Sequence, residues 1–96
     1  MTSWKHSPFE SYYHRGNQGE CKVRIDGAKI VLSYEQHDGP TVWEGEEVAA
    51  GHFKLTCARK RGSAILHRLP GGDVIEGHWS DGQNRGMWRI QLRDTL

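Results

Sequence analysis

The sequence predicts a small all-β domain, a single up-and-down antiparallel meander or barrel of seven to eight short strands. Segments that alternate apolar and polar residues, with the period of two that a half-buried strand requires, recur along the chain. Asp-Gly and Gly-Gly dipeptides separate many of these segments, and they are typical of tight hairpin turns. A chain of 96 residues encloses one core, so residues 1–96 are predicted to form one barrel-like domain.

Seven strands are expected from this alternation, each of about six residues, which is an ordinary strand length. Short turns join them, so consecutive strands are expected to pair as antiparallel neighbours. In chain order the strands are Glu20–Ile25, Lys29–Glu35, Thr41–Glu46, His52–Ala58, Ser63–Leu69, Val74–Trp79 and Met87–Leu92.

The turn dipeptides also predict which residues face each other, because a two-residue turn fixes the register of a hairpin. Type I′ turns centred on Asp26-Gly27, Asp38-Gly39, Gly71-Gly72 and Asp81-Gly82 give four test pairs: Val23 with Ile30, Tyr34 with Trp43, Leu66 with Gly77, and Gly77 with Gly86. In this register the large apolar side chains fall on one inner face. The expected core is Trp43, Phe53, Leu55, Leu66, Ile75, Trp79, Trp88 and Ile90.

Residues 1–19 leave two alternatives open. Ser7-Pro8-Phe9-Glu10 matches a helical capping box with proline at the first helical position, which predicts a short helix. Alternatively, Glu10 to Arg15 forms an eighth strand, and Gly16 to Gly19 forms the turn that follows it. We favour the strand, because it would close the sheet and remove its exposed edges, and because Tyr12-Tyr13 suits a strand.

Composition and charge restrict the classes of function. Lys and Arg number 13 against 12 Asp and Glu, so the molecule as a whole is not attracted to nucleic acid or to an anionic membrane. The chain lacks an apolar run of about 18 residues and an apolar stretch after Met1, which predicts a cytoplasmic protein. Cys21 and Cys57 are too few for a disulfide framework, and we expect two buried free thiols.

A glycine two residues before an aromatic ring recurs in or directly before three of the expected strands, in Gly51-His52-Phe53, Gly77-His78-Trp79 and Gly86-Met87-Trp88. Glycine and ring share a face, so the glycine lets a coiled strand bend and leaves a space that a neighbouring ring can cover. Either the four tryptophans fill a small barrel, or some of the rings line a ligand pocket. With the meander over residues 20–92, these elements resemble in architecture the calycin-type barrels, the lipocalin, fatty-acid-binding and avidin-like group. The resemblance implies an apolar ligand held inside the barrel.

A ligand site is expected in the barrel mouth, around one inward-pointing cation. The predicted register places Arg68 on the apolar inner face, where its guanidinium could hold a ligand carboxylate bidentately. Tyr34 or Tyr13 would be a second donor, and Trp43 and Trp88 would supply the apolar contacts. The alternative is that Arg68, near Pro70, reaches solvent or pairs with Asp73.

The six histidines provide little support for a metal site. On the outer face His67 and Glu76 are expected to be neighbours, in line with Lys54. Two ligands fall short of the four that a closed zinc site usually needs, and a nearby lysine repels a cation. A solvated cross-strand charge ladder is the better interpretation, and no metal or cofactor is predicted.

Catalysis and nucleic-acid binding are also weakly supported. No nucleophile elbow, P-loop or dinucleotide glycine pattern occurs, and the carboxylate pair Glu46-Glu47 is expected in a loop. We lean against an enzyme, although Arg68 and Tyr34 inside a barrel leave catalysis open. The basic turn Arg59-Lys60-Arg61 could touch phosphates, but the aromatic rings that would stack on bases are expected to point inward.

The function expected from the sequence is therefore non-catalytic binding of a small, partly apolar ligand that carries a carboxylate. The predicted contacts are Arg68, Tyr34, Trp43 and Trp88. The alternative is a protein-interaction or self-association module, such as a homodimer, with a filled core and no ligand.

Overall fold

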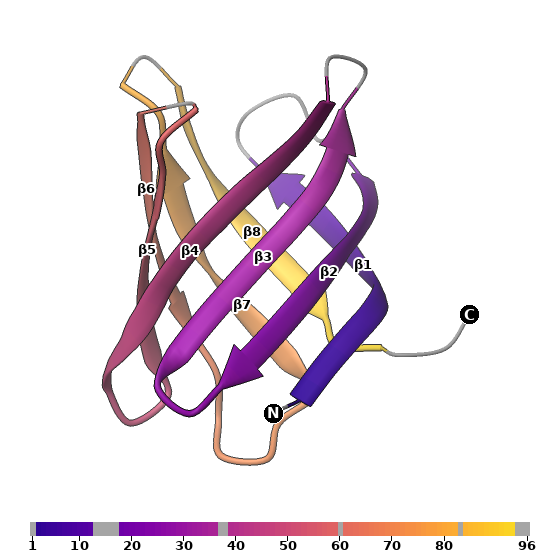
Figure 1. Ribbon diagram of the computed structural model, residues 1–96, viewed down its shortest axis with the longest axis vertical. Helices are drawn as coiled ribbons and strands as arrows, with labels where there is room; N and C mark the ends of the chain where they lie inside the picture. Colours follow the sequence, from indigo (N-terminus) through magenta and orange to yellow (C-terminus); the bar gives the residue numbers. More distant parts are fainter. Residues whose placement is uncertain (1, 13–17, 37–38, 60, 83, 94–96) are drawn as a thin grey trace.

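The chain forms a closed antiparallel barrel whose eight strands follow one another in sequence order (Figure 1). This computed structural model describes residues 2–12, 18–36, 39–59, 61–82 and 84–93. The strands are β1 (Thr2–Tyr12), β2 (Gln18–Asp26), β3 (Lys29–Gln36), β4 (Gly39–Ala49), β5 (His52–Cys57), β6 (Gly62–His67), β7 (Val74–Ser80) and β8 (Arg85–Gln91). The predicted all-β meander is confirmed, and the seven strands expected from alternation differ from the observed ones by at most three residues at either end.

The N-terminal segment is the eighth strand, so the helical alternative is wrong. β1 pairs with β2 and, through Phe9–Tyr12, with Met87–Ile90 of β8, which closes the sheet. The strand starts at Thr2 rather than at Glu10. Its register shifts between Trp4 and Ser7, and Pro8 follows this irregularity, where a strand tolerates proline. Residues 13–17, and with them Tyr13 and the first half of the expected turn, lie outside the described residues, and Gln18 and Gly19 belong to β2.

Three of the four predicted pairs are displaced by two residues, whereas Leu66 does face Gly77. Val23 and Trp43 both face Leu32, one from each side, and Gly77 faces Trp88. The reason in the first hairpin is that Gly27, with a φ of 61°, is the first loop residue and not the second. A positive φ at the first loop position alone is what a type II′ turn requires. A displacement of two residues leaves every side chain on its predicted face.

The inner face of the barrel is the hydrophobic core, and all eight residues predicted for it are buried. The two thiols are buried and free, as expected. The remaining apolar core residues are Val23, Ile30, Leu32, Ala64 and Leu92. On β5, β6, β7 and β8 buried and exposed positions alternate strictly or almost strictly, which is why the period of two was so clear in the sequence.

Glycines let the backbone and the rings of the barrel approach closely. A Cβ on Gly45 or on Gly77 would overlap the main-chain carbonyl oxygen of Lys54 or Ile65 on the neighbouring strand. The expected arrangement of a ring over a glycine occurs at Gly62, where an added Cβ would lie 3.1 Å from Cζ3 of Trp43. Gly51, expected to open a strand, lies instead in the β4–β5 turn with a φ of 75°.

Candidate functional site

Three of the four predicted contact residues meet in one cluster inside the barrel. The indole Nε1 of Trp43 donates a hydrogen bond to the hydroxyl oxygen of Tyr34 over 3.2 Å. The rings of Trp43 and Trp88 meet edge to face with their centroids 5.0 Å apart, and Trp79 stacks on Trp88 at 5.8 Å. Trp43 is only 1% exposed and Trp88 only 5%. These rings contact one another and leave little of their surface for a ligand from outside.

Arg68 lies at the other end of the barrel. The ring of Trp43 covers Gly62, the first residue of β6, whereas Arg68 follows the last residue of that strand. Six residues of extended strand separate the two positions by about 20 Å. Arg68 and Tyr34 are therefore too far apart to contact the same group of a small ligand. The register predicted for the turn at Gly71-Gly72 would have paired Arg68 with Ile75. The β6–β7 ladder instead ends at His67 and Glu76, so Arg68 lies outside it.

The guanidinium of Arg68 is held in place by the loop that follows it. Its Nε donates to the carbonyl oxygen of Gly72 over 2.7 Å, and its main-chain nitrogen donates to the carbonyl oxygen of Gly51 over 2.8 Å. The guanidinium carbon lies 5.1 Å from the ring centroid of Trp4, which is a cation–π contact. Within the described part of the chain, the two Nη nitrogens have no hydrogen-bond partner. The alternative pairing of Arg68 with Asp73 is therefore not present.

A hollow of about 580 Å³ opens beside Arg68. Its walls come from the β4–β5 turn, from the β6–β7 loop and from the outer side of β5, β6 and β7. Leu69, Pro70 and Val74 form its apolar part, and Leu69 is 79% exposed, the highest value for a large apolar side chain among the described residues. In Figure 1 this is the end of the barrel where the β2–β3, β4–β5 and β6–β7 turns gather.

Two histidines form a pair on the wall of this hollow. The Nδ1 atoms of His52 and His67 are 2.7 Å apart, and the rings meet at 82°. At this distance one Nδ1 donates a proton and the other accepts it. His67 faces Glu76 as predicted, but its partner on β5 is His52, because Lys54 faces Ile65. The two histidines lie at matched distances from the β5–β6 turn, which is the sequence signal that would have found the pair.

No group of three or more His, Cys, Asp or Glu side chains that could hold a metal ion occurs among the residues with described side chains. The carboxylate pair Glu46-Glu47 is part of β4 rather than of a loop, and Glu47 accepts a hydrogen bond from the main-chain nitrogen of Gly51 over 2.9 Å. Its carboxylate thereby stabilises the β4–β5 turn.

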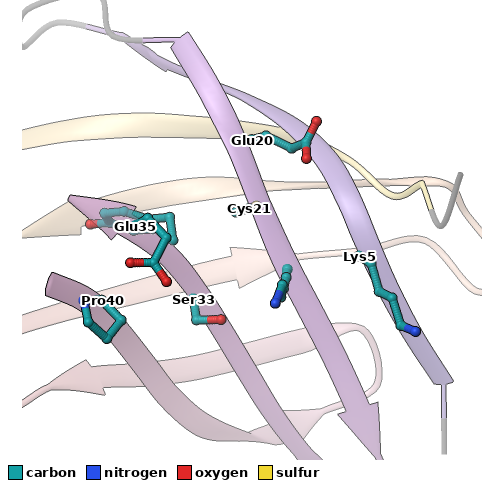
Figure 2. A pocket seen from close by; sticks show the side chains of 8 residues that line it. Lys5, Glu20, Cys21, Ser33, Glu35 and Pro40 are labelled. Atoms are coloured by element: carbon teal, nitrogen blue, oxygen red, sulfur yellow. The ribbon is translucent and has the colours of Figure 1, made fainter. Parts of the chain in front are cut away.

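Two smaller hollows lie on the outer face of the sheet, over β1, β2 and β3. Figure 2 shows the first, of about 210 Å³, with Lys5, Glu20, Ser33, Glu35 and Pro40 around it. The second, of about 290 Å³, adjoins it. Its lining residues are Ser3, Trp4, Lys5, Lys22, Val23, Arg24, Val31 and Ser33. Sequence reasoning missed this group because its cations come from two strands, one of them β1, whose pairing was not predicted residue by residue.

Burial controls the ionisation of two groups in the barrel. It raises the pKa of the Cys21 thiol to about 12, with a smaller contribution from the charge of Glu20. It also raises the pKa of the Tyr34 hydroxyl, against the opposing effect of the hydrogen bond from Trp43. Both groups are therefore protonated at neutral pH, and Cys21 does not supply a thiolate nucleophile.

Comparisons with protein-family models, with curated proteins and with solved structures found no match to this chain. Among the described residues, no helix has the length and apolar character needed to cross a membrane.

Proposed function

We propose that the protein is a non-catalytic binding protein for a small, partly apolar ligand that carries a carboxylate. The observation that carries this proposal is the guanidinium of Arg68, held by Gly72 and Trp4 at the edge of a hollow of about 580 Å³. Pockets for small ligands range over about 300–1,000 Å³. Because the guanidinium is already fixed, little side-chain entropy is lost when its two Nη groups bind a carboxylate.

The remaining walls of the hollow define the rest of the ligand. Leu69, Pro70 and Val74 offer an exposed apolar surface that a hydrocarbon chain or ring would cover. The His52–His67 pair offers polar groups on the strand side. Such a mixture of apolar lining and a few polar groups is typical of small-molecule sites.

The two carboxylates of the hollow limit where the ligand anion is placed. Glu76 lies 3.8 Å from Arg89, which offsets part of its charge, and Asp73 is exposed to solvent. A ligand carboxylate is therefore directed toward Arg68 and away from these two side chains. We therefore propose a site at the rim of the barrel rather than in its interior, where Trp43 and Trp88 contact each other.

Self-association is a second candidate function, favoured by the exposed apolar residues at the same end of the barrel. Leu69 is 79% and Val48 is 64% exposed, and they lie in or beside neighbouring turns. A second copy of the chain would bury both. Analytical ultracentrifugation of the protein and of Leu69→Ser tests this candidate: a dimer that Leu69→Ser dissociates supports self-association, and a monomer at all concentrations excludes it.

Titration calorimetry with hexanoate and with hexanol tests the ligand-binding proposal. Hexanoate is expected to bind and hexanol to bind at least about tenfold more weakly, a difference of about 1.4 kcal/mol. Arg68→Gln is expected to remove this preference, whereas Arg85→Gln, at the start of β8 and away from the hollow, keeps it. Equal affinity of hexanoate for the protein and for Arg68→Gln, or no binding of either compound, would overturn the proposal.

A further inference from the structure

The outer face of β1, β2 and β3 carries a cluster of cations that the proposed function does not use. We call it the basic groove: Lys5, Lys22 and Arg24, together with the hydroxyl groups of Ser3 and Ser33. These residues line the hollow of about 290 Å³, and no carboxylate is among its lining residues. Within the described part of the chain, none of the three cations makes a salt bridge or a side-chain hydrogen bond.

Strand pairing explains why these groups converge. Lys22 and Arg24 are two residues apart on β2, so both side chains point to the outer face. Ser33 faces Lys22 from β3, and Ser3 faces Arg24 from β1. The register shift that follows Trp4 places Lys5 at the same hollow. The groove is thus built from three neighbouring strands and not from one flexible loop.

The chemistry of this group matches a phosphate. Arginine and lysine donate charge-assisted hydrogen bonds to phosphate oxygens, and serine hydroxyls add neutral ones. No carboxylate lines this hollow itself, so a dianion bound there would reduce the repulsion among its three cations. Val31, on the outer face of β3, lines the same hollow and offers an apolar surface for an organic group.

We propose that the basic groove binds a small organic phosphate monoester. The adjoining hollow restricts the ligand further, because Glu20 and Glu35 line it just beyond Lys5 and Lys22 (Figure 2). A polyphosphate or a nucleic-acid backbone that extended in that direction would meet two carboxylates. A single phosphate at Arg24, with its organic group over Val31, avoids them. The site is independent of Arg68 and of the proposed carboxylate site.

The experiment is a titration of the protein with phenyl phosphate, followed by amide chemical shifts at constant ionic strength. We expect saturable binding, with the largest shifts on β1, β2 and β3. The double variant K22Q/R24Q is expected to bind at least about tenfold more weakly, since it loses two charged donors. The control K29Q/K54Q removes the same charge from exposed positions outside the groove and is expected to bind as the original protein does.

Each outcome of the titration decides the proposal. An equal loss in K22Q/R24Q and K29Q/K54Q shows attraction to net charge only and overturns it. So does tighter binding of an oligonucleotide or an acidic peptide than of phenyl phosphate. If K22Q/R24Q does not fold, Lys5→Gln replaces it, with at least a threefold loss expected and no loss overturning the proposal. Arg68→Gln is expected to leave phenyl phosphate binding unchanged, which keeps this test separate from that of the carboxylate site.

Discussion

Trp43 and Tyr34 are joined by a hydrogen bond from the indole Nε1 to the hydroxyl oxygen, although they do not face each other across β3 and β4. Trp43 is 1% exposed, so its N–H has little access to water. The hydroxyl of Tyr34 therefore satisfies a polar group that the largest side chain of the core brings into the barrel.

Tyr34→Phe is expected to destabilise the protein by about 1–2 kcal/mol, because it leaves the buried indole N–H of Trp43 without its acceptor. Urea unfolding measured by tryptophan fluorescence gives the free energy of unfolding of both proteins. Val42→Ala, on the outer face of β4 and 40% exposed, is the control for a surface change and is expected to cost less. A Tyr34→Phe protein as stable as the original would show that water replaces the phenol.

Gly77→Ala is expected to cost about 3 kcal/mol or more, since the new Cβ would overlap the main-chain carbonyl oxygen of Ile65 on β6. Gly71→Ala is the matched control: its added Cβ meets no atom within 4 Å, but its φ is 71°. That backbone conformation costs an alanine about 1–2 kcal/mol. Thermal unfolding of the two variants should therefore rank Gly77→Ala as much the less stable. The reverse order would mean that β6 and β7 can separate at little cost.

How much of this structure was predictable depends on whether local chemistry or long-range geometry decides each feature. The period of two identifies inner and outer faces, so the core around Trp43 and Ile75 follows from the sequence. The loop position of Gly27 does not, since Asp-Gly and Gly-Ala both suit a tight turn. A shift of two residues leaves faces intact but changes which side chains meet.

The candidate site was less predictable than the fold for the same reason. Arg68 was expected to extend a ladder that ends at His67, and the carbonyl of Gly72 captures its Nε instead. The hollow beside Arg68 depends on the conformation of the six-residue loop between β6 and β7. Pro70 restricts one φ of this loop, but Gly71 is conformationally permissive, so the sequence does not specify the loop conformation. Tyr34, Trp43 and Trp88 were correctly placed on one inner face, but their mutual contacts depend on ring orientation.

Alkaline pH is expected to destabilise the protein through Cys21. Its pKa is about 9.0 when exposed and about 12 in the fold, where burial favours the neutral thiol. Between these two values the unfolded chain loses the thiol proton and the folded chain keeps it, so the free energy of unfolding falls as pH rises. The slope from this group approaches about 1.4 kcal/mol per pH unit. Measuring the free energy of unfolding of the protein and of Cys21→Ala from pH 7 to pH 11 isolates the contribution of this thiol. If the two free energies fell with pH in parallel, Cys21 would not be the cause of the alkaline destabilisation.

Ser7→Ala is expected to loosen the closure of the barrel, because Ser7 joins β1 to the chain that follows β8. Its side chain is fully buried, and its Oγ accepts a hydrogen bond from the main-chain nitrogen of Arg93 over 3.1 Å and lies 3.3 Å from the carbonyl oxygen of the same residue. Among the described residues, pairing between β1 and β8 runs over Phe9–Tyr12, so the contact of Ser7 with Arg93 extends the closure beyond this ladder. Losing it leaves two main-chain groups without a protein partner, at a cost of about 1–2 kcal/mol.

Amide hydrogen exchange locates the effect of Ser7→Ala along the chain. Protection from exchange should fall first at residues 3–7 and 91–93, whereas β5 and β6 should stay protected. Ser63→Ala, exposed on the outer face of β6, is the control and should leave the exchange of β1 unchanged. Uniformly faster exchange in every strand would contradict a local clamp and would mean that opening at Ser7 unfolds the whole barrel. That outcome would place the closure of β1 on β8 among the contacts that limit global stability.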